Sequence, residues 1–160
     1  EAADFHGFQK IPHQGTFNAN PISAGTGVEM LGQVAEAEIS EQANNQGRKL
    51  TSACNQAFSD EGVPWAAYGN GSSVYIFTNP ELVDIDPINF DAGAMPFSTM
   101  EKASDHPATS LFRLAMLVNG VDFNSKPGAI VSAVHSDNDI RITADAVRAS
   151  ATMLREEGHI

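Results

Sequence analysis

The sequence predicts an α/β or α+β layer fold in which helices pack on a small mixed sheet. Apolar residues recur at helical spacing in several segments, and two segments rich in aromatic and β-branched residues flank a glycine-rich turn. Segments with these two patterns alternate along the chain, which is typical of layered helix-and-sheet folds. A length of 160 residues, of which 42% are apolar, is enough to bury one core.

A first helix is expected to begin at Pro21. The side chain of Asn20 can accept hydrogen bonds from the free backbone N–H groups of a helix start, and proline suits the first helical position. The apolar residues at helical spacing are Ala24, Val28, Leu31 and Val34. The glycines inside this helix are Gly25, Gly27 and Gly32. Each costs about 1 kcal/mol relative to alanine, so we expect another backbone to pack closely against them, in a core or a subunit interface.

A longer helix and a β-hairpin are expected to follow. The helix should cover residues 40–60, because its apolar positions form one stripe. That stripe consists of Ile39, Ala43, Gln46, Leu50, Cys54 and Ala57. Residues 65–68 and 74–78 have the composition of strands, and the turn chemistry of residues 69–72 joins them.

The middle of the chain has no convincing hydrophobic periodicity. Residues 79–107 are rich in Pro, Asp, Gly and Ser, and so long a span without secondary structure is typical of a functional or mobile loop. A helix is expected next over residues 108–119. Gly120, in the left-handed conformation, should end it.

Two short strands and a final helix complete the predicted fold. The strands are expected over residues 121–123 and 129–134, separated by a turn at Pro127 and Gly128. Ser136 and Asp139 have the spacing of a capping box, so the final helix should begin there and end at Gly158. Its apolar face consists of Ile140, Ala144, Val147, Ala151 and Leu154.

The charge composition argues against nucleic acid and membrane partners. Nine Lys and Arg residues against 20 Asp and Glu residues give a formal charge of −11, which repels phosphate backbones and anionic lipid. The longest aliphatic run, Leu114 to Val118, is far shorter than the roughly 20 residues of a membrane-spanning helix. The single cysteine, Cys54, excludes an internal disulfide, and we expect a cytoplasmic location.

Three constellations of reactive residues are better explained structurally. The five histidines lack the paired spacing of a zinc site, so no metal site is expected. Ser132, His135 and Asp137 are the residue types of a hydrolase triad, but they are too near in sequence to converge, and His135 is interpreted as structural. A small hydrolase that uses Ser132 and His135 is nevertheless one alternative function for this chain. The Gly69-Asn70-Gly71 segment lacks the third glycine of a dinucleotide fingerprint.

The segment around Thr16 is a candidate anion-binding turn. Gly15 lets the backbone approach a ligand closely, Thr16 supplies a hydroxyl, and the start of a capped helix follows. Such a turn can direct its hydroxyl and backbone donors at a phosphate. On this pattern by itself, a polar turn that only caps a helix is the stronger interpretation.

Two parts of the sequence carry a family resemblance. The first is residues 13–27, His-Gln-Gly-Thr-Phe-Asn-Ala-Asn-Pro-Ile-Ser-Ala-Gly-Thr-Gly. The second comprises residues 111–117 and 119–121, followed by residues 127–135 and 139–140. The first resembles the segment after the cofactor-lysine region of class III pyridoxal-phosphate (PLP) aminotransferases, especially glutamate-1-semialdehyde aminomutase-like members. The second is similar to the carboxy-terminal small domain of that family.

The resemblance implies a fold, a cofactor and a reaction. The fold is the carboxy-terminal part of the aspartate-aminotransferase-like PLP transferase fold, which forms a dimer with active sites at the subunit interface. Residues 1–34 would end the large domain, and residues 35–160 would form the small domain. The threonine matching Thr16, beside Gly15, would help to hold the phosphate of the pyridoxal 5'-phosphate bound to the neighbouring subunit. The reaction is transfer of an amino group between an amino compound and a keto or aldehyde acceptor.

The sequence departs from that family at two points. The Schiff-base lysine of the family belongs well before the threonine, and Lys10 lies too close to Thr16 to replace it. We therefore expect the isolated chain to be inactive and to need the amino-terminal portion of the enzyme or a homodimer partner. Pro127 stands where aminomutases tend to have glutamate, which favours a related transaminase. The alternative is a non-catalytic interaction module that dimerises through the helix of residues 21–34.

Overall fold

The computed structural model describes residues 15, 20–36, 38–124 and 128–160. The chain divides into two units, residues 1–37 and residues 38–160. The described part of the first unit is essentially one helix, α2 (Pro21–Glu36), which begins at the predicted proline. The Asn20 side chain accepts hydrogen bonds from the backbone N–H groups of Ile22 and Ser23, at 2.9 and 3.3 Å, so the predicted helix cap is confirmed.

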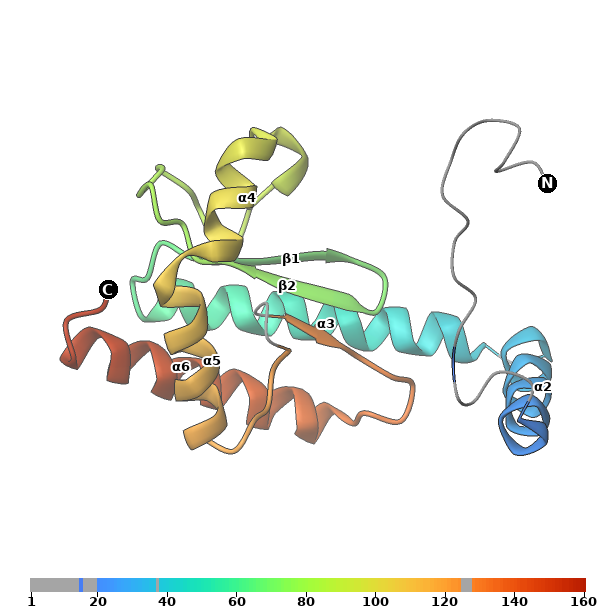
Figure 1. Cartoon of the computed structure of the whole chain (residues 1–160). Helices are drawn as coiled ribbons and strands as arrows, with labels where there is room; N and C mark the ends of the chain where they lie inside the picture. Colours follow the sequence, from blue (N-terminus) through green and yellow to red (C-terminus); the bar gives the residue numbers. More distant parts are fainter. Residues whose placement is uncertain (1–14, 16–19, 37, 125–127) are drawn as a thin grey trace. The chain divides into compact units, whose positions relative to one another are not determined.

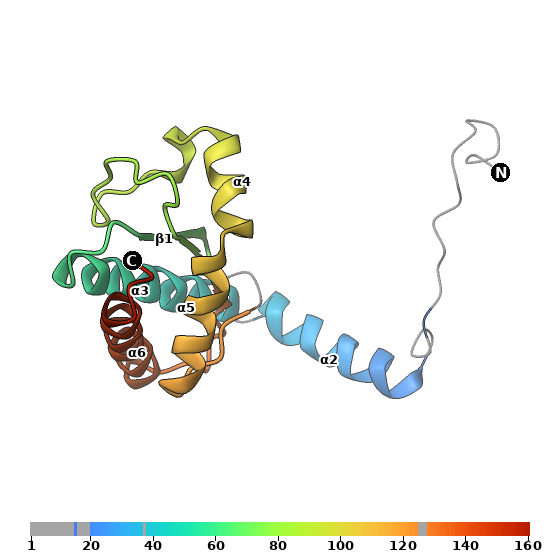
Figure 2. The ribbon, with the colours of Figure 1, turned by 60° about the vertical axis from the view of Figure 1, so that its left-hand side comes forward.

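The second unit consists of helices packed on a three-stranded sheet (Figure 1), which confirms the predicted fold class. Its elements in chain order are α3 (Ile39–Asp60), β1 (Ala66–Asn70), β2 (Ser73–Phe77), the short 3-10 helix η1 (Ala92–Ala94), α4 (Phe97–Asp105), α5 (Pro107–Val118), β3 (Gly128–Ile130) and α6 (Asp137–Glu156). The strand order is β1-β2-β3, and both pairs are antiparallel rather than mixed. Helices α3 and α6 lie on one side of the hairpin and α4 on the other (Figure 2).

The core lies between the sheet and helices α3, α5 and α6. Phe58 of α3, Trp65 before β1 and Phe112 of α5 meet edge-on or tilted, with ring centroids 5.4 to 6.1 Å apart, and all three are buried. Edge-to-face contact is the arrangement that aromatic quadrupoles favour. The predicted apolar face of α6 is confirmed, because every one of its members is buried: Ile140, Ala144, Val147, Ala151 and Leu154.

Both ends of α6 are held by polar contacts. The capping box is confirmed: the Ser136 hydroxyl accepts from the Asp139 backbone N–H, and the Asp139 carboxylate accepts from the Ser136 backbone N–H at 2.7 Å. These bonds from Ser136, the backbone one foremost, hold the pKa of Asp139 below its usual value. Near the other end, Arg148 donates to Asp60 at 2.9 Å and Arg155 pairs with Glu61, which joins α6 to the end of α3.

The hairpin turn packs directly on α3. Asn70 pairs with Ser73, so Gly71 and Ser72 form a two-residue turn, and Gly71 has a φ of +61° that favours glycine. A Cβ atom at Gly47 of α3 would lie 2.2 Å from the Gly71 carbonyl oxygen. The predicted hairpin is confirmed, but its turn is shorter than predicted, because residues 69 and 70 belong to β1. A glycine at position 47 permits the close approach of this turn to the helix.

The outer edge of β1 is closed by a side chain of α3. The Asn55 side-chain amide donates to the Ala67 carbonyl at 3.0 Å and accepts from the Ala67 backbone N–H at 2.6 Å. Both residues are buried, with exposed fractions of 7% and 1%. Asn55 therefore replaces the backbone of a fourth strand at this position.

The expectation that residues 79–107 form an unstructured loop is wrong. They include η1 and the nine-residue helix α4. Helix α4 has only nine residues, and those that it buries, Thr99 and Ala103, are small, so a stripe of large apolar residues does not mark it in the sequence. Before it, the buried Asn79 side chain donates to the carbonyls of Pro64 and Val83, at 2.9 and 2.8 Å, and so fixes the path of the chain.

Predictions for the last third of the chain are confirmed in part. Helix α5 ends as predicted before Gly120, which has a φ of +86°. Residues 121–123 are not a strand; their segment meets β3 through one bond, from the Asn124 N–H to the Gly128 carbonyl. The predicted strand over residues 129–134 is only β3, because His135 N–H donates to the Ser132 carbonyl and turns the chain toward α6. None of the described helices has the length and apolarity needed to cross a membrane.

We predict that Asn55→Ala destabilises the protein by roughly 2–4 kcal/mol, because it leaves a buried N–H and C=O of Ala67 without partners. Urea unfolding followed by circular dichroism measures this free energy. The matched control is Gln56→Ala on the exposed side of α3, for which we expect a change within about 0.5 kcal/mol. Equal effects of the two substitutions would contradict the role of Asn55.

Candidate functional site

The predicted anion-binding turn is only partly within the described residues. Thr16 lies outside them, while Gly15 is exposed and belongs to no helix or strand. Four residues after Thr16, Asn20 caps α2. Binding of a phosphate by Gly15 and Thr16 therefore stays a prediction.

Helix α2 presents apolar side chains and small residues on its surface. Among the described residues of this unit, the exposed large apolar side chains are Ile22, Val28, Met30, Leu31 and Val34. A Cβ atom at Gly25, Gly27 or Gly32 would meet nothing within 4 Å. The expected close-packed neighbour is thus not among the described contacts, and its existence stays a prediction.

A cavity of about 280 Å³ lies at the outer edge of β3. Its lining residues are Leu50, Val121, Asp122, Phe123, Asn124, Gly128, Ala129, Ile130, Val131, His135, Asp139, Ile140 and Thr143. Arg113 of α5 holds one wall: its Nε donates to the Phe123 carbonyl at 2.7 Å, and its guanidinium pairs with Asp122 at 3.0 Å. Sequence reasoning missed this role of Arg113. The one signal that could have indicated it is that Arg113 is the single charged residue of an otherwise uncharged helix.

The carboxylates of this cavity are already engaged by neighbouring groups. Asp122 is bound by Arg113, and Asp139 accepts the bonds of the capping box. Gln46 of α3 donates to the His135 carbonyl at 2.8 Å, which fixes the chain at the opposite wall. The described lining therefore offers apolar walls, one histidine, and the polar side chains of Asn124 and Thr143. Both carboxylates of that described lining are held by other groups, so neither is free to act as a general base.

Ser132 and His135 do come together, contrary to the expectation that they are too near in sequence to converge. The Ser132 Oγ lies 2.9 Å from Nδ1 of His135, and the Ser132 backbone N–H donates to the same nitrogen at 3.0 Å. The convergence does not extend to Asp137, whose carboxylate pairs with Lys49 instead. Because Nδ1 accepts a backbone hydrogen bond, His135 acts as a structural acceptor in the turn before α6, and no triad is assembled.

The two lysines among the described residues are surface cations. Lys49 pairs with Asp137 and Lys102 with Glu81, and the lysine side chains are 52% and 61% exposed. The described part of the chain thus does not present the buried, unpaired lysine that would suit a Schiff base. The same described residues contain no group of three His, Cys, Asp or Glu side chains that could hold a metal ion.

Cys54 is part of the core. It is fully buried on α3, and burial raises the pKa of its thiol from 9.0 to about 12. A buried thiol with so high a pKa is a poor nucleophile at neutral pH. This residue is therefore structural, as its place in the apolar stripe indicated.

The structure is similar to parts of solved transaminases. A transaminase with PLP bound aligns with 94% of this chain at a TM-score of 0.68 and 21% identity, and the match covers 31% of that protein. An omega-transaminase from Sphaerobacter thermophilus aligns with 91% of the chain (TM-score 0.66, 20% identity, 31% of that protein). The PLP internal aldimine form of FumI from Sphingopyxis sp. MTA144 aligns with 93% (TM-score 0.64, 17% identity, 31% of that protein).

These similarities establish a shared fold. The chain spans about 31% of the length of the transaminases it matches, so it corresponds to one part of their fold. No protein-family model matches the sequence.

We predict that stability falls as pH rises from about 9 toward 12, because the unfolded thiol of Cys54 ionises near 9.0 and the folded one near 12. The slope should be about 1.4 kcal/mol per pH unit. Denaturant unfolding across this pH range measures it. Cys54→Ala should be less stable at neutral pH, but its free energy of unfolding should lack the part of the pH dependence that the thiol causes. An unchanged slope in the variant would contradict the raised pKa of Cys54.

Proposed function

We propose that the chain is the carboxy-terminal part of a PLP-dependent aminotransferase that moves an amino group between an amino compound and a keto or aldehyde acceptor. The observation that carries this proposal is the structural alignment with a transaminase with PLP bound, which covers 94% of this chain. The string of residues 13–27 supports it independently, because its resemblance to class III enzymes rests on the residues before and within α2 rather than on the fold of the second unit.

In this proposal, the chain and the rest of the enzyme have different tasks. Bound PLP supplies an electron sink for the amino-transfer reaction, and a lysine elsewhere in the enzyme holds it. Gly15 and Thr16 bind its phosphate, and residues 35–160 form the small domain. The surface ion pairs of Lys49 and Lys102 are consistent with a cofactor lysine outside the described residues.

The finer assignment is a class III enzyme related to the glutamate-1-semialdehyde aminomutase-like members. Pro127, which lies outside the described residues, favours a transaminase over a strict aminomutase. A homodimer with active sites at its interface and a cytoplasmic location complete the proposal. The single reduced thiol of Cys54 is consistent with that location.

We predict that Thr16→Ala in the complete enzyme weakens PLP retention roughly ten- to a hundredfold, because one charge-assisted hydrogen bond to the phosphate is lost. Dialysis against PLP-free buffer, followed by the cofactor absorbance, measures retention. Thr26→Ala is the matched control: the Thr26 hydroxyl bonds the Ile22 carbonyl at 3.0 Å inside α2, so PLP retention should not change. Equal retention in the wild type and Thr16→Ala would remove Thr16 from the site.

We predict that the 160-residue chain by itself shows no aldimine absorbance after incubation with PLP and dialysis, and no transaminase turnover. Borohydride reduction followed by peptide mass spectrometry tests for a lysine-linked cofactor. Lys10→Arg is the informative variant, because an adduct present in the wild type and lost in this variant would make Lys10 the cofactor lysine and overturn the division of tasks proposed above.

A further inference from the structure

The sequence contains two Asn-Gly pairs, and the structure places them in different surroundings. One is Asn70-Gly71 at the tip of the β1–β2 hairpin, and the other is Asn119-Gly120 at the end of α5. In such a pair, the backbone nitrogen of the glycine can attack the amide carbon of the asparagine side chain, because glycine has no side chain to hinder the approach. The surroundings of each pair therefore decide whether this reaction can occur in the folded protein.

Both reacting groups of the Asn119-Gly120 pair are engaged in hydrogen bonds. The Asn119 side-chain amide donates to the Ala115 carbonyl at 2.9 Å and to the Ser150 hydroxyl at 3.3 Å, and Asn119 is half-buried. The Gly120 backbone N–H donates to the Leu117 carbonyl at 3.1 Å. Attack would have to break all three of these bonds, so the fold protects this pair.

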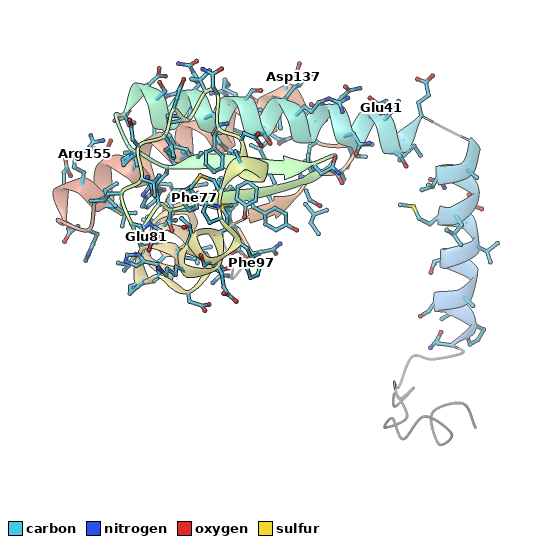
Figure 3. The ribbon with its side chains drawn as sticks, turned by 90° about the horizontal axis from the view of Figure 1, so that it is seen from above. Glu41, Phe77, Glu81, Phe97, Asp137 and Arg155 are labelled. Atoms are coloured by element: carbon cyan, nitrogen blue, oxygen red, sulfur yellow. The ribbon has the colours of Figure 1, made fainter. Side chains whose placement is uncertain are left out.

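In the Asn70-Gly71 pair, the same two groups are free. Asn70 is exposed, and within the described residues neither its side-chain amide nor the Gly71 backbone N–H has a hydrogen-bonded protein partner. The hairpin extends beside α3 from Phe77 toward the end of the helix that carries Glu41 (Figure 3), and the turn lies at its tip. A hairpin tip opens locally at lower cost than the core does, which lets the Asn70 side chain reach the next backbone nitrogen.

The turn has little room for a longer main chain. A Cβ atom at Gly47 of α3 would lie 2.2 Å from the Gly71 carbonyl oxygen, and one at Gly71 would lie 2.5 Å from Oδ1 of Asn44. The Ser72 carbonyl accepts a hydrogen bond at 2.8 Å from the backbone N–H of Val131, which follows β3. A change of the main chain in this turn would therefore disturb its contacts with both α3 and the chain after β3.

We propose that Asn70 is a site of spontaneous modification, at which the side-chain amide cyclises onto the Gly71 nitrogen. The Gly71 N–H gives its proton to water or hydroxide, and the bond from nitrogen to Cγ of Asn70 forms. The Cγ–Nδ2 bond breaks, and Nδ2 takes up a proton and leaves as ammonia. Water then opens the succinimide ring at either carbonyl, so that residue 70 becomes aspartate or isoaspartate.

The isoaspartyl product carries its Cβ atom in the main chain. The turn is thereby lengthened where it rests on Gly47 and beside Asn44, and its contact with α3 is weakened. This reaction needs only water and the residues of the hairpin. It is therefore independent of the proposed function and can be tested without the cofactor.

Incubation of the folded protein at mildly alkaline pH, followed by peptide mass spectrometry, tests the proposal. Modified peptides gain the mass difference between an amide NH₂ and a hydroxyl group, and enzymatic methylation identifies isoaspartate. We expect modification at Asn70 roughly tenfold or more faster than at Asn119, because the hydrogen bonds that hold Asn119 must open first. In urea, where both pairs are unfolded and both are followed by glycine, the two rates should be similar.

Asn70→Gln is the matched variant. Glutamine keeps the amide, but its additional methylene group makes ring closure onto the Gly71 nitrogen slow, so the modified peptide should disappear. The isoaspartyl form of the wild type, separated by chromatography, should have an unfolding midpoint roughly 2–4 °C below that of the unmodified protein, because the turn loses its fit against α3. Asn70→Gln incubated in the same way should keep its midpoint.

Three results would overturn the proposal. Equal rates at Asn70 and Asn119 in the folded protein would mean that the fold does not select between the two pairs. An Asn70 that stays intact in the folded protein, while both pairs react in urea, would mean that the hairpin protects it. An isoaspartyl form with an unchanged midpoint would mean that the turn accommodates the longer main chain without losing its contact with α3.

Discussion

The close approach of α3 to the hairpin is the contact on which the second unit depends. Gly47 lets the turn at Gly71 rest on the helix, and two turns further along, Asn55 satisfies both backbone groups of Ala67. These contacts fix the distance between the hairpin and the helix, and the position of the hairpin along the helix axis. Since β3 is aligned on β2, and α5 and α6 pack on the same core, the remaining elements are positioned relative to this pair.

Buried hydroxyl and amide groups organise the connections that lack a hydrophobic pattern. The hydroxyls of Thr78 and Thr109 lie 3.1 Å apart, and the Thr109 hydroxyl donates to the Ala103 carbonyl at 2.7 Å. This small network joins the end of β2 to the end of α4 and the start of α5. Together with Asn79, it holds in place a segment that composition by itself would assign to a loop.

The candidate site was accessible to sequence reasoning only through local signals. The cap at Asn20 and the start of α2 are confirmed, because a cap depends on residues two or three positions apart. The phosphate-binding role of Gly15 and Thr16 depends on a cofactor and on other chain segments, so no local pattern determines it. The contact of Ser132 with His135 was missed for a related reason: a tight turn, absent from the predicted strand, brings the two side chains together.

The sequence by itself determined α3, the hairpin, α5 and α6, because their periods, caps and left-handed glycines act over a few residues. It did not determine α4, the shortness of β3 or the irregular path of residues 121–124. Those features are decided by tertiary contacts that no local pattern records: the burial of Thr99 and Ala103 of α4, and the hydrogen bond that Arg113 donates to the Phe123 carbonyl. A short segment has too few apolar residues for a period, so its conformation follows from whichever buried polar groups and neighbours it meets.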